Sequence, residues 1–145
     1  MRLHVRILAS ATILALAVIS SQAMACSCQR NPTAEGILDS ASAVFTGVVE
    51  ESTQVAPGQS LTIFRVTESF KGAPPGTIVR VTHRDGPSPS CGVDFAPGKT
   101  YTLAAYQADT VADLSTSFCS TWMFLPHVGL SKGLIKRMRE IRQRP

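Results

Sequence analysis

Several functional patterns are missing from this 145-residue sequence. It has no glycine-rich phosphate loop and no internal repeat, which leaves no motif for a nucleotide-binding enzyme or a repeat protein. Charged residues make up only 17% of the chain and aromatic residues 6%. Val, Ile, Leu and Phe are nevertheless plentiful enough to exclude wholesale disorder, and the length is that of one domain with a buried core.

Histidine is scarce, and its placement does not suggest a metal site. With the cysteines oxidised, only His83 and His127 remain as nitrogen side-chain ligands beyond residue 25, and their separation is not that of a metal site. His83 lies near Asp85 and Ser88, a loose likeness to a hydrolase triad, but no nucleophile-elbow sequence accompanies it. We interpret His83 as part of a polar loop, and we expect neither a cofactor nor enzymatic activity.

The only long apolar run lies at the start of the chain, where Met1–Ala25 has the features of a secretory signal. Basic residues precede an uncharged stretch over Ile7–Ile19, and Ala23-Met24-Ala25 fits an A-x-A cleavage pattern. A membrane span needs about 20 apolar residues, so a cleaved signal is favoured over an anchor. The sequence predicts a signal peptide over 1–25 and one domain over 26–145, secreted or periplasmic.

Two features of the predicted mature chain concern membranes. No later apolar stretch approaches membrane length, so we expect no transmembrane span. Cys26 becomes the first residue, and a cysteine in that place can be lipidated. Bacterial lipidation sites usually carry Leu three positions earlier, where this chain has Ala23. We therefore favour an unmodified N-terminus.

Basic residues gather near the C-terminal end of the chain. They are Lys132, Lys136, Arg137, Arg139, Arg142 and Arg144, opposed by Glu140. Such a run can bind nucleic acid or an anionic surface, but it is more often the solvated face of a terminal helix. No aromatic residues are interleaved, so we expect no nucleic-acid partner. An amphipathic helix capped by Ser131 is predicted from the helical spacing of Leu134, Ile135, Met138 and Ile141.

All four cysteines lie in the predicted mature chain, at Cys26, Cys28, Cys91 and Cys119. An even number in an exported chain predicts two disulfides. Residues two apart in an extended chain are separated by about 6.6–6.8 Å, at the limit for a disulfide, so Cys26 and Cys28 are each expected to pair with a distant partner. Spacing leaves both remaining pairings open. Either the bridges only stabilise a small domain, or they hold the new N-terminus still for a purpose.

Five segments are predicted to be short β-strands separated by turns that contain Gly or Pro. They are Ala43–Glu50, Leu61–Thr67, Thr77–Thr82, Thr100–Tyr106 and Ala112–Phe118. Gly47 predicts a bulge or tight curve in the first strand. A short helix, capped by Asn31 or Thr33 and ending near Ser40, precedes them. Five short strands with a helix at either end favour a small closed barrel, because closure leaves no exposed strand edge.

These residues resemble the tissue inhibitors of metalloproteinases, in the netrin-like form of the five-stranded OB barrel. The likeness spans nearly the whole predicted mature chain. It rests on Cys26-Ser27-Cys28, Ala43-Val44-Phe45-Thr46-Gly47, Phe70-Lys71-Gly72, Ser90-Cys91-Gly92-Val93, Gly98-Lys99-Thr100-Tyr101, and Cys119 followed by Phe124-Leu125-Pro126. The resemblance implies a single-domain, bacterial-type member with an OB-fold (netrin-like) barrel, a short N-terminal helix and a C-terminal amphipathic helix.

The same resemblance implies a disulfide pairing and a function. The bridges are then Cys26–Cys91 and Cys28–Cys119, and the protein is a secreted inhibitor of zinc metalloproteinases. In that family the α-amino nitrogen and carbonyl oxygen of the first residue, here Cys26, bind the catalytic zinc of the target protease. The implied partner is a secreted zinc metalloproteinase, and we expect the inhibitor to be a monomer.

The resemblance also assigns contacts around the zinc ligand. Ser27 enters the specificity pocket beside the metal, and Ser88, Pro89 and Ser90 add contacts as a second ridge. The alternative function is a non-inhibitory extracellular binding module, which uses the barrel face or the basic C-terminal helix.

Overall fold

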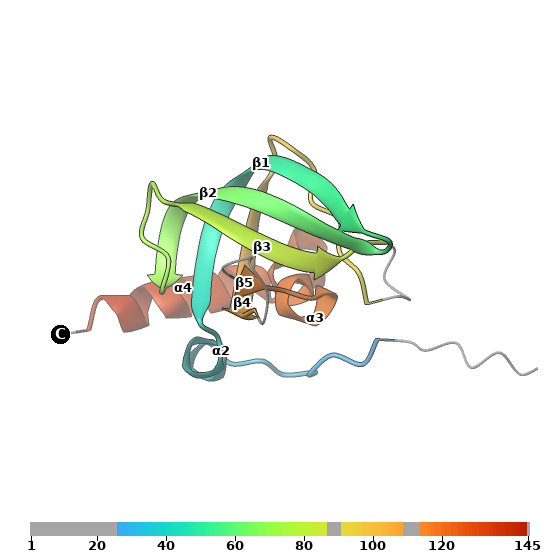
Figure 1. Ribbon diagram of the computed structural model, residues 1–145. Helices are drawn as coiled ribbons and strands as arrows, with labels where there is room; N and C mark the ends of the chain where they lie inside the picture. The colour runs from blue at the N-terminus through green and yellow to red at the C-terminus, as the bar shows by residue number, and fades with distance from the viewer. Residues whose placement is uncertain (1–25, 87–90, 109–113, 145) are drawn as a thin grey trace, which may run out of the picture.

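The computed structural model describes residues 26–86, 91–108 and 114–144, so the predicted signal peptide lies outside the described residues. In the described part, five strands form one mixed sheet that closes on itself in the order β1-β2-β3-β5-β4 (Figure 1). The strands are β1 (Ala43–Ala56), β2 (Gln59–Lys71), β3 (Ile78–Arg84), β4 (Thr100–Gln107) and β5 (Leu114–Ser115). The helices are α2 (Ala34–Ser40), α3 (Phe118–Thr121) and α4 (Ser131–Arg142), with 3-10 turns η3 (Trp122–Phe124) and η4 (Pro126–Val128). The expected mainly β fold is confirmed.

The strands β1 and β2 form a long antiparallel hairpin that closes between Ala56 and Gln59. A register shift falls between Thr46 and Gly47, which confirms the irregularity predicted there. A Cβ on Gly47 would lie 3.1 Å from the carbonyl oxygen of Arg65, so glycine permits the close approach of the two strands. Both strands run further than predicted. The added part of β1 is mostly exposed, so it carries no apolar alternation that could have predicted it.

The prediction of a strand over Ala112–Phe118 is wrong in extent. Within the described residues, β5 has only two residues, which pair parallel with β3 and antiparallel with β4. Thr116 still joins the two neighbours, donating from its backbone nitrogen to Thr82 and from its hydroxyl to Ala104. Phe118 instead begins α3, whose second residue, Cys119, is bonded to Cys28.

Apolar side chains form two cores, one on each face of the sheet. The inner core is Ala43, Phe45, Val49, Phe64, Val66, Ala73, Val79, Val81, Phe95, Leu103 and Ala105. The outer core, formed with α2, η3 and α4, is Ala34, Ile37, Ala41, Val44, Phe70, Ala104, Met123, Phe124, Leu134 and Met138. Successive strand residues point to opposite faces, so adjacent residues such as Val44 and Phe45 serve different cores.

The two predicted terminal helices are present, and one predicted cap is wrong. Thr33 caps α2 by accepting a hydrogen bond from the Gly36 nitrogen at 3.1 Å. The apolar face of α4 packs on the outer core as expected. Ser131 does not cap α4: it is the first helical residue, it is buried, and Leu130 occupies the cap position without a side-chain bond. Among the described residues, no helix has the length and apolar character needed to cross a membrane.

The basic residues lie on the solvent-exposed face of α4, as expected, and three of them also contact other elements of the chain. Arg139 donates two hydrogen bonds to Glu68 of β2, at 2.8 and 2.7 Å. Arg137 contacts Glu35 of α2, with Nε to Oε1 at 2.7 Å. Arg142 donates to the carbonyl oxygen of Ser69 at 2.6 Å. These contacts fix α4 behind the sheet (Figure 1).

The contact between Arg139 and Glu68 predicts a pH-dependent part of the stability. Hydrogen bonds from Arg139 lower the pKa of the Glu68 carboxyl below its ordinary value. Such a carboxyl stabilises the fold above its unfolded-state pKa, and the contribution is lost as the pH falls through the folded-state pKa. We expect Glu68→Gln to lower the melting temperature by about 2–4 °C at pH 7. The difference from wild type is expected to shrink from pH 7 to about pH 3, as the pH falls toward the lowered pKa of Glu68.

Glu140→Gln is the matched control for this measurement. Within the part of the chain that the structure describes, Glu140 pairs within α4, with Arg137 at 3.5 Å, and makes no ion pair with the sheet. We expect its melting curve to follow wild type at both pH values. A Glu68→Gln deficit of equal size at pH 3 and pH 7 would exclude the ionised carboxylate as its cause.

Candidate functional site

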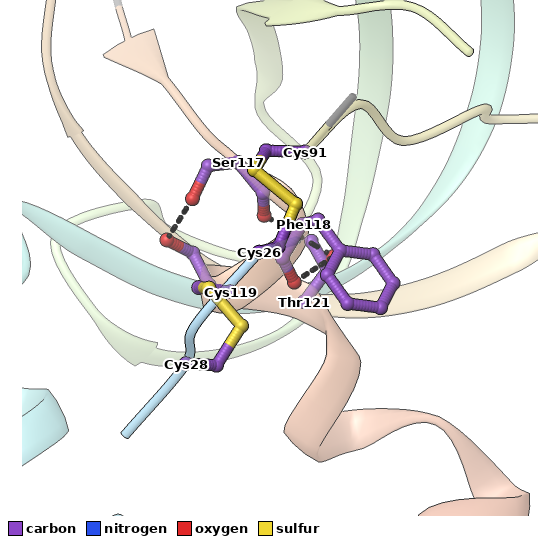
Figure 2. Close-up of a disulfide and its surroundings, with 8 residues drawn as sticks. Cys26, Cys28, Cys91, Ser117, Phe118, Cys119 and Thr121 are labelled. Atoms are coloured by element: carbon purple, nitrogen blue, oxygen red, sulfur yellow. Dashed lines mark hydrogen bonds between the residues drawn. A yellow bond between two sulfur atoms is a disulfide. The ribbon is translucent and has the colours of Figure 1, made fainter. Parts of the chain in front are cut away.

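Two disulfides hold the start of the described chain against the body of the domain. Cys26 is bonded to Cys91 and Cys28 to Cys119, with Cα–Cα distances of 5.4 and 5.1 Å. This is the pairing that the family resemblance implies, and spacing alone had left it open. Figure 2 shows the two bridges side by side, entering the N-terminal segment from different parts of the chain. The backbone of residues 26–28 is therefore attached at both ends.

The helix α3 is the platform under this segment. Cys119 is its second residue, and the Thr121 hydroxyl donates to the carbonyl oxygens of Phe118 and Ser117, at 3.0 and 3.3 Å. The Phe118 nitrogen also bonds the carbonyl oxygen of Cys91 at 3.4 Å, which links the anchors of the two bridges. Figure 2 places Phe118 and Thr121 beside Cys26. Sequence reasoning missed this helix, since four residues give no periodicity and Ser117 is only a weak start signal.

The second anchor, Cys91, follows an unusual backbone path. Its φ is 59°, the left-handed region that costs a non-glycine residue roughly 1–2 kcal/mol. The next position, residue 92, requires glycine, because a Cβ on Gly92 would overlap the carbonyl group of Asp85. We name Arg84–Gly86 together with Gly92–Asp94 the neck, since these two stretches bind each other directly. The Val93 nitrogen donates to the Arg84 carbonyl oxygen at 2.9 Å, and the Gly86 nitrogen to the Asp94 carboxylate at 3.2 Å.

The predicted site residues have different exposures. Ser27 is exposed, whereas the flanking Cys26 and Cys28 are partly buried. The structure thus brings the predicted N-terminal residues, Cys91 and Cys119 into one place with a polar side chain presented between two bridges. Ser88, Pro89 and Ser90, the predicted second ridge, lie outside the described residues.

The tip of the β1–β2 hairpin borders the neck. The Asp85 nitrogen donates to the Gly58 carbonyl oxygen at 3.1 Å, and the Gln54 amide contacts the Asp85 carboxylate at 3.4 Å. The hairpin therefore supports Asp85, in the first stretch of the neck. The sequence had predicted a connecting segment between Glu50 and Leu61. In the structure most of that segment belongs to β1 and β2, and it forms the hairpin tip that contacts the neck.

A cavity of about 530 Å3 opens next to the platform helix. It lies between β4, the segment that follows Cys91, and the residues from α3 to α4. Its walls are mostly apolar, with Phe118, Phe124 and Ile135 among them, and Asp94 is the one charged residue in the described lining. The described lining contains no His, Cys or Lys, and so pairs no basic side chain with a nucleophile.

His83 is not in a polar loop, so that interpretation is wrong. It is the sixth residue of β3 and is buried inside the sheet, where Nε2 lies 2.8 Å from the Thr62 hydroxyl. The alternation of β3 could have predicted this burial. His83 lies two residues after the buried Val81, and residues two apart in a strand share one face. Of its suggested triad partners, Asp85 lies 3.8 Å away and Ser88 is outside the described residues.

No group of three or more His, Cys, Asp or Glu side chains in the described residues is arranged to hold a metal ion. Comparison of the sequence with protein-family models gives no match, and comparison with curated proteins gives none either. A proposal for the function therefore has to be based on the geometry around Cys26.

Proposed function

We propose that this protein is a secreted inhibitor of zinc metalloproteinases, of the type of the tissue inhibitors of metalloproteinases, on a netrin-like OB barrel. One observation carries the proposal. Two disulfides two residues apart fix a short segment at the domain surface, and the exposed Ser27 stands between them. Both bridges also stabilise the domain, and by holding the segment at both ends they fix the position of Ser27 before any partner binds.

The chemistry of an N-terminal Cys26 suits a ligand for a zinc ion in another protein. An α-amino group has a reference pKa of about 7.7–8.0, so it becomes a neutral nitrogen donor at little cost near neutral pH. Together with the carbonyl oxygen of the same residue it can chelate the target's zinc and displace the water that attacks the substrate. The inhibitor then acts as a plug and not as a catalyst.

Rigidity makes the chelate effective. Because both bridges hold the segment before binding, little conformational entropy is lost when it enters the protease. In this proposal the exposed Ser27 enters the pocket beside the metal, and its small side chain suits a shallow or polar pocket. The bridges and the lack of a membrane-spanning helix in the described residues are compatible with export, which cleavage after Ala25 would complete.

Binding to a protease with and without its zinc tests the proposal. Chain beginning at Cys26 is titrated against a zinc metalloproteinase, against the same enzyme stripped of zinc, and against a serine protease. We expect stoichiometric inhibition of the zinc enzyme, binding to the stripped enzyme weaker by about a hundredfold or more, and no effect on the serine protease. Equal affinity for the zinc-loaded and stripped forms would exclude chelation.

A further inference from the structure

The cavity beside α3 takes no part in the proposed contacts with a protease. Its volume of about 530 Å3 lies within the range of about 300–1,000 Å3 that is usual for small-molecule sites. Its described walls come from the neck, from the start of β4, and from the chain between α3 and the first turns of α4. Apolar side chains make up most of these walls, among them Val93, Phe95, Phe118, Phe124, Leu125 and Ile135. Such walls favour a ligand whose larger part is apolar.

Ser131 places a polar group in the wall that α4 contributes. The residue lines the cavity and is 8% exposed, and within the described residues its hydroxyl has no hydrogen-bond partner. Among the same residues, Trp122 Nε1 is the one buried side-chain polar atom that is both unpartnered and sealed from solvent. The Ser131 hydroxyl is therefore reachable from the cavity. Buried hydroxyls are normally hydrogen-bonded, so this one is a group that a ligand can bind.

Three backbone N–H groups lie at the same end of α4. The first hydrogen bond of this 12-residue helix runs from the Leu134 nitrogen to the Leu130 carbonyl oxygen, and no side chain caps the helix. The nitrogens of Ser131, Lys132 and Gly133 therefore have no partner within the helix. Free N–H groups at a helix start, together with the helix dipole, favour an anion.

The charged residues near the cavity also favour a negative head group at α4. Lys132 and Lys136 each follow a lining residue of α4 and are exposed, and neither forms an ion pair within the part of the chain that the structure describes. Asp94, the one charged residue in the described lining, comes from the neck and accepts a hydrogen bond from the Gly86 nitrogen. The wall at α4 is thus the positive one, and it offers donors to an acceptor group.

We propose that this cavity binds a small molecule with an apolar body and a single carboxylate. The carboxylate accepts hydrogen bonds from the Ser131 hydroxyl and from the first N–H groups of α4. The apolar body lies along Phe118, Phe124 and Ile135. Because Phe118 belongs to the platform helix, the ligand packs against the element that carries Cys119. Binding requires neither zinc nor a protease, so this proposal stands or fails separately from the proposed inhibition.

Titration with decanoate, followed by calorimetry and nuclear magnetic resonance, tests the proposal. The disulfide-bonded chain is used at pH 7, where the carboxylate is ionised. We expect a Kd of about 10–100 µM, with shifts of the backbone amide signals of Ser131, Lys132 and Gly133. Decanol and decylamine carry the same apolar chain and are expected to bind at least about tenfold more weakly. Equal binding of either analogue, or no binding of decanoate at about 1 mM, overturns the proposal.

Two serine variants test the assigned hydroxyl. Ser131→Ala is expected to weaken decanoate binding by about tenfold and to leave decanol binding unchanged, because a hydrogen bond to a charged group contributes more. Ser120→Ala is the matched control. Ser120 is also 8% exposed, but it lies outside the described lining and its hydroxyl is 3.1 Å from that of Ser117. The control is expected to bind decanoate as wild type does.

A third variant tests the apolar wall. Ile135→Phe enlarges a lining side chain that is only partly buried, and it is expected to weaken decanoate and decanol by equal factors. Melting curves confirm that each variant is folded. Decanoate affinity that none of the cavity variants changes, or that Ser120→Ala lowers as much as Ser131→Ala does, places the ligand elsewhere and overturns the assignment. None of these measurements needs a target protease.

Discussion

Retaining a single residue before Cys26 is expected to abolish inhibition. A chain that begins at Ala25 has an amide in place of the α-amino group, and the lone pair of an amide nitrogen is delocalised into the carbonyl group and does not bind zinc. The extra residue also fills the space that the metal would occupy. We expect the inhibition constant for a zinc metalloproteinase to rise by about a thousandfold or more, the equivalent of roughly 4 kcal/mol.

The measurement compares inhibition constants of the chain starting at Cys26 and the chain starting at Ala25 against one protease. An added alanine after Pro145 gives a matched control of the same mass, and it is expected to inhibit as the unextended chain does. Intact mass confirms both disulfides in each form, and circular dichroism confirms the fold. Equal inhibition by the two N-terminal forms would rule out the α-amino group as a zinc ligand, and with it the proposed function.

Removing the bridge between Cys28 and Cys119 is expected to cause the largest loss of stability. The bridge spans 91 residues of sequence. With the other bridge intact, however, the shorter closed path runs through Cys26–Cys91 and contains about 30 residues, which corresponds to roughly 3.5 kcal/mol in the chain-entropy model. For a domain of this size we expect the double variant Cys28→Ala/Cys119→Ala to melt about 10–15 °C lower.

The same variant also tests whether the bridge orders the site. It leaves the segment held only at Cys26, so binding has to restrict its motion, and we expect inhibition to weaken by about ten- to a hundredfold. Ser27→Ala is the control for stability, since its side chain is exposed and it is expected to melt with wild type. A double variant that melts within 3 °C of wild type would show that α3 and the N-terminal segment stay docked without the bond.

Short-range sequence patterns predicted most of the strands and both terminal helices. Alternation identified β3, and runs of strand-forming residues between Gly- and Pro-containing turns identified β1 and β4. The cap at Asn31 or Thr33 and the apolar spacing of α4 identified the terminal helices. Each of these signals depends on residues a few positions apart, so the sequence displays it directly. Where the signal was absent the prediction stopped short, as in the exposed outer half of the β1–β2 hairpin.

The sequence likewise predicted some features of the candidate site and missed others. The Cys26-Ser27-Cys28 pattern was enough to predict that two bridges start side by side from the predicted N-terminus. Three further features came from the folded structure alone: α3 lies beneath the bridges, Arg139 binds Glu68, and His83 is buried beside Thr62. Each of these depends on which distant groups meet when the sheet closes, and closure brings together residues whose separation along the chain leaves no periodic trace.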